Sequence, residues 1–466
     1  MVFSSIAFLI AFLPLAVALE RSMSKMIAKN VVLIAASLVF YAYGEPTYVA
    51  LLLASSVMNY VLGLLVAPGR EGRRAWIVVA VAANLGMLAV FKYADMAIGT
   101  LNTLFGADLP LPHIPLPLGI SFYTFQALSY VIDVYRDDVA PQRNLAWLTL
   151  YISFFPQLVA GPIVKYHDFG PQIYRRRASL EDTAQGMRRF ACGLAKKVLL
   201  ANTMAVCADR LYALDQGLLS AHAAWLAAAA YLLEIYLDFS AYSDMAIGLG
   251  RIFGFSFPEN FEHPYSSTSM REFWRRWHIS LSTWFLRYLY IPLGGNRLGR
   301  RRTAINRAIV FFCCGLWHGA SWTFVVWGLL HGAALLFEEY VDVRRLPRAV
   351  AHVVVVLFVG LTFVVFRADT IAQAAGHIRA MLLGWNPTNA QLVPVMSCLT
   401  PPFLIAAAVG TLISGSLPER AARLASHSRY FVVFDGLCYA AAIVLLMASM
   451  VVLAGGTYNP FIYFRF

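Results

Sequence analysis

The stretch Thr47-Tyr-Val-Ala-Leu-Leu-Leu-Ala-Ser-Ser-Val-Met-Asn-Tyr-Val-Leu-Gly-Leu-Leu-Val-Ala67 decides the fold class of this chain, because none of its 21 residues is charged. A helix needs about 20 apolar residues to cross the hydrocarbon of a bilayer. Strands of a membrane barrel would instead alternate apolar and polar residues over segments of about ten. The stretch therefore predicts a transmembrane α-helix.

The rest of the chain has the same character. Of its 466 residues, 60% are hydrophobic and only 13% are charged, against about 25% charged in a soluble domain. This composition excludes a large water-soluble catalytic domain and predicts an all-α polytopic membrane protein of about ten to twelve transmembrane helices. We find no internal repeat and no long linker, so we expect a single domain over residues 1–466. Further apolar runs lie at about 3–19, 31–43, 76–91, 119–134, 145–164, 223–240, 309–330, 350–366, 403–413 and 431–453, with a weaker, amphipathic one at 190–207.

The basic residues orient the first helices. Arg21 and Lys29 follow the first apolar run and Arg73 follows the third, whereas Glu45 lies between the second and the third. Cytoplasmic loops carry an excess of Lys and Arg, so we expect the first and third loops to be cytoplasmic. The run at 145–164 is interrupted by prolines and predicts a broken or re-entrant helix, whose freed backbone groups need partners in the protein or water.

The net charge of +12 and the cysteines exclude some classes of function. In a membrane protein, such an excess of basic residues usually marks cytoplasmic loops and contacts with anionic lipid headgroups, so we expect membrane lipids and no nucleic acid as partners. The six cysteines form no Cys-x-x-Cys pair, and we expect no metal site and no bound cofactor.

One basic stretch has two interpretations. Between Arg271 and Arg307 there are nine arginines and a single acid, with aromatic residues among them. It fits an interfacial belt of Trp and Arg side chains. It equally fits a cytoplasmic vestibule that attracts a phosphate-bearing donor such as a coenzyme A thioester, with Arg275, Arg276 and Trp277 as candidate donor-binding residues.

The segment Gly315-Leu-Trp-His-Gly-Ala-Ser-Trp322 places a histidine within an apolar run. An ionisable group at membrane depth is costly and usually faces a cavity or a partner, so His318 is a candidate functional residue; a hydrogen bond to a neighbouring helix would also explain it. Gly315 and Gly319 permit a close backbone approach. His331 follows thirteen residues later and would point to nearly the opposite side of a continuous helix. It is interpreted as a residue that packs in the fold or lies near an interface.

Glu234, Asp238 and Tyr242 recur every four residues and therefore share one helical face. Two carboxyl groups stacked at membrane depth would repel each other if both were ionised, so we expect one to be protonated or paired with an arginine. The face indicates a polar lumen. Substrate binding and helix packing remain alternative roles for Asp238 and Tyr242.

Seven motifs lie at 116–126, 155–163, 238–248, 272–284, 290–297, 316–322 and 459–466. Taken in order, they resemble those of bacterial membrane-bound O-acyltransferases of the alginate-acetylating type. The similarity extends over essentially the whole chain.

The resemblance implies a funnel-shaped helical core with re-entrant and interfacial helices, in a multi-pass protein of the bacterial inner membrane. The family's catalytic histidine falls on His318, and the neighbouring Trp317 is a further substrate-binding candidate. A second polar position of the family falls on His278, which would take part in catalysis by orienting the acyl carbonyl or the donor. His318 would act as a general base on an acceptor hydroxyl, attacking an acyl thioester such as acetyl-coenzyme A.

The same resemblance implies an acetyl group passed across the membrane to an exported, alginate-like polysaccharide. The expected partners are a periplasmic acetyltransferase of the SGNH, or serine esterase, type and the machinery of polysaccharide synthesis and export. The alternatives are a transporter or flippase for an acyl donor or lipid-linked sugar, and an acyltransferase of the same family that acts on peptidoglycan or teichoic acid.

Overall fold

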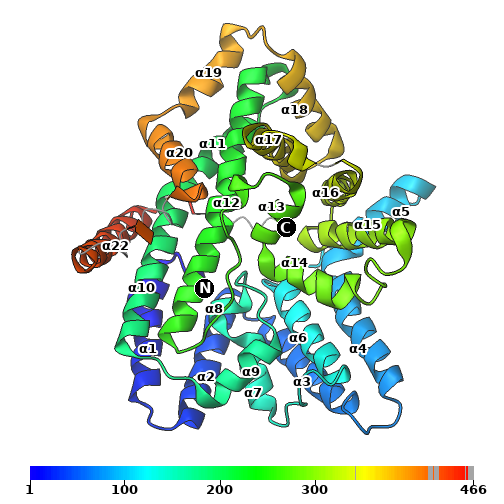
Figure 1. Ribbon diagram of the computed structural model, residues 1–466, viewed down its shortest axis with the longest axis vertical. Coiled ribbons are helices and arrows are strands. Elements are labelled where there is room, and N and C mark those ends of the chain that lie inside the picture. The colour runs from blue at the N-terminus through cyan, green and yellow to red at the C-terminus, as the bar shows by residue number, and fades with distance from the viewer. Residues whose placement is uncertain (342, 418–422, 425–429, 457, 460–466) are drawn as a thin grey trace. The chain divides into compact units, whose positions relative to one another are not determined.

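The computed structural model describes residues 1–341, 343–417, 423–424, 430–456 and 458–459. All regular secondary structure in these residues is helical (Figure 1), so the predicted all-α fold is confirmed. The last sequence motif, at 459–466, lies outside the described residues apart from Asn459.

The chain divides into two compact units, and the first comprises residues 1–190 and 243–259. The division falls within two helices, α10 (Leu180–Ala195) and α12 (Ala221–Ile252). The other helices of the first unit are η1 (Phe8–Phe12), α1 (Leu13–Ser22), α2 (Met26–Gly44), α3 (Val49–Leu65), α4 (Arg73–Leu88), η2 (Ala89–Tyr93), α5 (Ala94–Phe105), α6 (Ile120–Tyr135), α7 (Leu145–Ser153), α8 (Phe155–Leu158) and α9 (Tyr166–Arg175).

The run at 145–164 is broken, as the prolines predict. Helix α7 ends at Ser153, the four-residue α8 follows, and the chain then continues without regular structure through buried residues. Side chains bond to the carbonyl groups near this break: Tyr151 donates to the carbonyl of Val164 over 2.9 Å, and Gln157 donates to that of Tyr151 over 2.6 Å. The protein itself thus satisfies part of the interrupted backbone.

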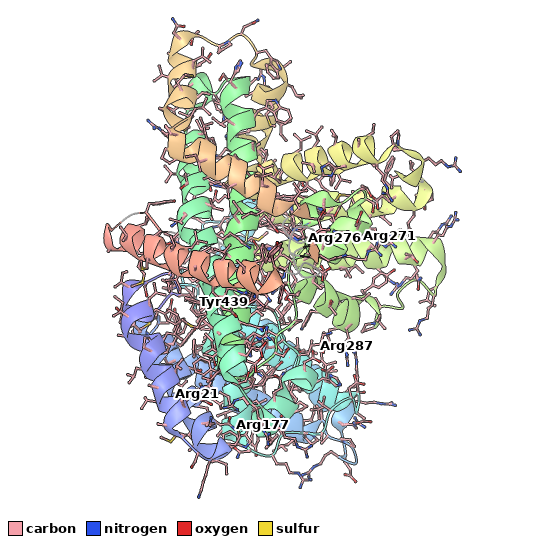
Figure 2. The ribbon with its side chains drawn as sticks, turned by 60° about the vertical axis from the view of Figure 1, so that its left-hand side comes forward. Arg21, Arg177, Arg271, Arg276, Arg287 and Tyr439 are labelled. Atoms are coloured by element: carbon pink, nitrogen blue, oxygen red, sulfur yellow. The ribbon has the colours of Figure 1, made fainter. Side chains whose placement is uncertain are left out.

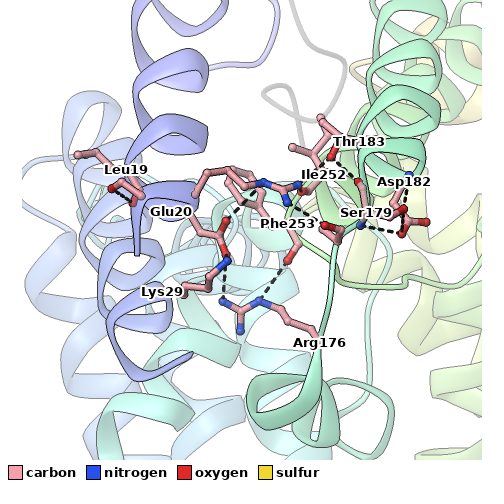
Figure 3. Close-up of polar contacts among 12 residues, drawn as sticks. Leu19, Glu20, Lys29, Arg176, Ser179, Asp182, Thr183, Ile252 and Phe253 are labelled. Atoms are coloured by element: carbon pink, nitrogen blue, oxygen red, sulfur yellow. Dashed lines mark hydrogen bonds and ion pairs between the residues drawn. The ribbon is translucent and has the colours of Figure 1, made fainter. Parts of the chain in front are cut away.

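A cluster of charges, mostly buried, joins the end of α1 and the start of α2 to the end of α9 (Figure 3). The carboxylate of Glu20 lies 3.3 Å from Nζ of Lys29 and 3.9 Å from Nη2 of Arg176. Arg176 also donates from Nε to the carbonyl of Phe253 over 3.1 Å and from Nη1 to Asn30. Nε of Arg21 lies 3.8 Å from the same carboxylate, so one buried carboxylate compensates three cations.

We predict that Glu20→Leu lowers the melting temperature of the protein in detergent, because it leaves Lys29 and Arg176 facing each other without a carboxylate. Breaking a buried ion pair by removing one partner typically costs about 3–5 kcal/mol. The control is the exposed Glu71→Leu, which should leave the melting temperature nearly unchanged. Equal melting temperatures for the two variants would contradict a stabilising role for the cluster.

The second unit comprises residues 191–242 and 260–466. Besides its parts of α10 and α12, its helices are η3 (Lys196–Ala201), α11 (Asn202–Tyr212), η4 (Gln216–Leu218), η5 (Pro264–Ser266), α13 (Met270–Arg276), α14 (Ile279–Phe285), η6 (Leu286–Tyr290), α15 (Gly299–His318), α16 (Trp322–Tyr340), η7 (Val343–Arg345), α17 (Arg348–Arg367), α18 (Ile371–Leu383), α19 (Asn389–Cys398), α20 (Pro401–Ser414) and α22 (Phe431–Ala454).

The protein is a multi-pass membrane protein. Within the described residues, six helices are long and apolar enough to cross a bilayer, or seven if α19 and α20, bent by 66° at their junction, form one span. Helix α3, at 17 residues, is a shorter apolar helix, and the run at 145–164 is divided. The predicted number of ten to twelve crossings stays a prediction. The six helices are Met26–Gly44, Arg73–Phe105, Leu180–Tyr212, Ala221–Ile252, Arg348–Arg367 and Phe431–Ala454.

The prediction of one span at 309–330 is wrong. Helix α15 ends at His318, Gly319 is extended, and α16 begins at Trp322. The side chain of Ser321 accepts a hydrogen bond from the backbone N–H of Thr323 over 3.3 Å, which is the usual way for a serine to start a new helix. His318 is therefore at the tip of a helical hairpin and not inside a continuous helix.

Glycines let α15 and α16 pack closely (Figure 1). A Cβ atom at Gly315 would lie 2.4 Å from the carbonyl oxygen of Phe324, and one at Gly328 would lie 2.2 Å from that of Phe311. Both distances are too short for any side chain, and both atoms in contact belong to the backbone. The close approach predicted at Gly315 is thus confirmed, and Gly328 is its counterpart on α16.

We predict that Gly315→Ala and Gly328→Ala each reduce the yield of folded protein and lower its melting temperature, because the two helices must separate. Overpacking of this kind costs about 1–3 kcal/mol. Gly86→Ala on α4 is the matched control, since a Cβ there meets nothing within 4 Å and alanine favours a helix. If all three variants have the same melting temperature, the close contact between α15 and α16 does not contribute to stability.

Candidate active site

His318 is the last residue of α15 and is 4% exposed. Aromatic rings surround its imidazole. The ring centroids of Trp317 and Trp327 both lie 5.1 Å from it, and that of Phe366 lies 5.3 Å from it. Electrostatic interactions are stronger in surroundings of low polarity than in water. A proton gained or lost by this ring therefore changes the electrostatic energy of nearby polar groups more than it would in water.

His278 lies immediately before α14 in a left-handed conformation, with φ of 43°, and is fully buried. Its Nδ1 is 3.1 Å from Oδ1 of Asn260. That oxygen also accepts from the backbone N–H and the hydroxyl of Ser280, over 3.1 and 2.9 Å. An amide oxygen only accepts hydrogen bonds, so Nδ1 of His278 carries the proton and Nε2 presents its lone pair.

Burial lowers the pKa of His278 to about 3, because desolvation disfavours the charged ring. The imidazole is therefore neutral near neutral pH. Within the described part of the chain, its Nε2 has no hydrogen-bond partner. A buried acceptor without a partner is uncommon in folded proteins, and this one is available to a donor supplied by a substrate or by another residue.

The fold brings His278 and His318 together across forty residues of sequence. Their ring centroids are 6.3 Å apart with an angle of 65° between the ring planes. Trp317 lies beside both rings, 5.6 Å from His278, and Phe239 of α12 contacts His278 at 4.6 Å. We call His278 and His318 the histidine pair.

Two cavities adjoin α13. The first, which we call the apolar cavity, has a volume of about 330 Å³ and is lined mainly by apolar side chains, among them Trp274, Phe311 and Cys314. Cys314 precedes His318 by one turn of α15. The second, which we call the polar cavity, has a volume of about 710 Å³. Arg271 and Arg275 line both cavities.

The comparisons with known proteins identify the family. The sequence profile of the membrane-bound O-acyltransferase family matches residues 142–353, which include the histidine pair. The chain is 37% identical to a probable alginate O-acetylase of Azotobacter vinelandii over the full length of both proteins. The chain belongs to the membrane-bound O-acyltransferase family. It is therefore an O-acyltransferase.

Two further relatives differ in the names they carry. A probable alginate O-acetylase of Pseudomonas aeruginosa is 43% identical over 82% of this chain and 75% of its own length. A peptidoglycan O-acetyltransferase of Helicobacter pylori is 35% identical over 82% of this chain and 80% of its own length. The relatives thus share the family and differ in the acceptor that their names state.

The predicted donor-binding residues of this acyltransferase have different surroundings. Arg275 is exposed and lines both cavities. Arg276 instead forms an ion pair with Glu272 over 2.7 Å (Figure 2 labels Arg271 and Arg276). Trp277 is 2% exposed and stacks on Phe273 with 5.6 Å between the ring centroids. Arg275 is therefore accessible from both cavities, whereas Arg276 and Trp277 make contacts within the fold.

Asp238 forms a buried ion pair that the sequence reasoning missed. Its Oδ1 lies 2.8 Å from Nζ of Lys197 in η3, and both side chains are almost fully buried. The cation paired with Asp238 is therefore a lysine. Tyr242, one turn further along α12, is also buried. The presence of Lys197 within the amphipathic run at 190–207 could have indicated this pair in the sequence.

Asn260 is another residue of the candidate site that the sequence did not indicate. It lies in a loop eighteen residues before His278, and only the fold brings the two side chains together.

The described residues contain no group of three or more His, Cys, Asp or Glu side chains able to hold a metal ion.

We predict that Asn260→Ala lowers acyl transfer about tenfold with normal folded yield. The change removes the acceptor that fixes the tautomer of His278, and a buried donor without a partner costs about 1–3 kcal/mol. Transfer of a radiolabelled acyl group in membranes measures the effect. Asn102→Ala, which removes solvent-exposed hydrogen bonds, is the control. A wild-type rate for Asn260→Ala would show that the orientation of His278 does not matter.

Proposed function

We propose that this acyltransferase moves an acetyl group from a cytoplasmic thioester donor, acetyl-coenzyme A, for the O-acetylation of an exported, alginate-like polysaccharide. The observation that carries the proposal is the histidine pair, which lies one helical turn beyond an apolar cavity flanked by arginines. The names of the full-length relatives support acetyl as the group and alginate as the class of acceptor.

The cavities suit the two parts of such a donor. Its phosphates need cations, and guanidinium groups bind phosphate well; Arg271 and Arg275 offer them where the two cavities adjoin. Its pantetheine arm and acetyl group are mostly uncharged and fit the apolar cavity. Cys314 at the wall of the apolar cavity shares a helical face with His318, so the thioester would approach the histidine along α15.

In the proposed reaction, His318 acts as a general base. It takes the proton from an acceptor hydroxyl as the oxygen attacks the carbonyl carbon of the thioester. The carbon–sulfur bond then breaks, and the proton passes from the imidazolium to the leaving thiolate. His278 assists through the lone pair on Nε2, by accepting a hydrogen bond from the imidazolium of protonated His318. Base catalysis of this kind contributes about 10²–10⁴-fold.

We also propose that the enzyme works in the bacterial inner membrane together with a periplasmic acetyltransferase of the SGNH type and with the polysaccharide export machinery. A chain with only 13% charged residues has little sequence for a soluble domain that could carry acetyl groups to a polymer outside the membrane. A second candidate acceptor is peptidoglycan, because the Helicobacter pylori relative is named for it.

We predict that His318→Ala abolishes transfer of label from radiolabelled acetyl-coenzyme A, with a loss of about 10²-fold or more, and that His278→Ala causes a smaller loss. Membranes with matched protein levels receive a periplasmic fraction, with either alginate-like polymer or peptidoglycan as the final acceptor. His167→Ala, an exposed residue of the first unit, is the control.

Label that reaches a periplasmic protein or the polymer only when His318 is intact would support both the reaction and the partner. Full transfer by His318→Ala would refute its role as the base. Label on peptidoglycan alone would replace the proposed acceptor. Absence of transfer by the wild type from acetyl-coenzyme A would refute the proposed donor.

A further inference from the structure

Helix α13 carries the two arginines that line both cavities, yet it is only seven residues long. Arg271 and Arg275 are four residues apart and so lie on one face of it. Helices this short have little stability of their own. The position of the two guanidinium groups therefore depends on whatever holds α13 in place.

Helix α16 holds α13 at two points. The carboxylate of Glu338 accepts hydrogen bonds from the backbone N–H groups of Met270 and Arg271, the latter over 3.0 Å. One turn along α13, the indole Nε1–H of Trp274 donates to Nδ1 of His331 over 3.2 Å. His331 and Glu338 are seven residues apart, two turns of helix, and thus lie on the same face of α16.

The hydrogen bonds of His331 fix its tautomer. An indole N–H only donates, so Nδ1 of His331 is the acceptor and the ring proton is on Nε2. Nε2 lies 2.9 Å from the hydroxyl of Thr362, which itself donates to the carbonyl of Val359 over 2.9 Å. A directed chain of hydrogen bonds thus runs from α13 through α16 to α17. Both nitrogens of this fully buried ring are used, so His331 has no free lone pair for base catalysis.

Trp274 connects this chain to the apolar cavity. Its ring forms part of the cavity wall and lies 5.1 Å from that of Phe311 on α15. Trp327 packs between the two histidines of the hairpin, with its ring 4.8 Å from His331 and 5.1 Å from His318. A shift of Trp274 would change the cavity wall and move α13, while His318 keeps its own contacts with Trp317 and Phe366.

We propose that His331 is a positioning residue for the acyl donor. By accepting the hydrogen bond of Trp274, it keeps the wall of the apolar cavity in place and holds Arg271 and Arg275 at the junction of the two cavities. The inference rests on the proposed function, since it concerns the affinity for the thioester donor. It assigns His331 an effect on donor binding and none on the chemical step.

The test compares two substitutions of His331 by steady-state transfer from acetyl-coenzyme A in proteoliposomes. His331→Leu removes the acceptor for Trp274, and we expect KM for the donor to rise about tenfold with kcat little changed. His331→Gln keeps one acceptor and one donor, and we expect it to restore KM to near the wild-type value. His222→Leu, an exposed position on α12, is the control.

The partner of the hydrogen bond supplies a second test that does not depend on the folding of His331→Leu. Trp274→Phe keeps a ring in the cavity wall and removes the N–H, and we expect it to raise KM as His331→Leu does. Because both changes break the same hydrogen bond, the double variant His331→Leu/Trp274→Phe should be no worse than either single one.

The possible results distinguish the positioning role of His331 from the proposed acetyl transfer. Unchanged KM values in an active enzyme, additive effects in the double variant, or a fall in kcat alone would overturn the positioning role and leave the proposed function intact. A wild type that transfers no acetyl group from coenzyme A would refute the proposed donor, and the positioning role would fall with it.

Discussion

The close contact between α15 and α16 is the constraint on which the rest of the candidate site depends. Gly315 and Gly328 each face backbone carbonyl groups of the other helix at distances that exclude a side chain. The contact fixes His318, at the tip of the hairpin, against Trp327. Helix α15 also supplies one side of the apolar cavity, through Val310, Phe311 and Cys314. A wider hairpin would displace the histidine from the cavity that leads toward it.

Two buried histidines beside this hairpin differ in how their ring nitrogens are hydrogen-bonded. Both ring nitrogens of His331 are hydrogen-bonded, which makes it a link between helices. His278 has one partner, Asn260, and its Nε2 has none within the described residues. Since an unsatisfied buried acceptor costs free energy, its retention beside His318 fits a group that meets its donor only when substrate is bound.

The sequence predicted much of this, for physical reasons that are local. Continuous apolar runs predicted the helices, Pro156 and Pro162 predicted the break at 145–164, and Gly315 predicted the close approach. The break after His318 was missed, although Ser321 carried the signal of a helix start. Partners far apart in the chain could not be read from spacing: Asn260 for His278, Lys197 for Asp238, and Trp274 for His331. The roles of the predicted site residues stay predictions.

The most direct test of the account is a structure of the protein with a non-hydrolysable thioether analogue of acetyl-coenzyme A, determined by electron cryomicroscopy in lipid nanodiscs. The account predicts that the phosphates contact Arg271 and Arg275 and that the arm runs through the apolar cavity. The atom of the analogue that corresponds to the carbonyl carbon of the acetyl thioester should then lie beside His318. An analogue bound elsewhere, with the apolar cavity empty and His318 remote from the acyl group, would contradict it.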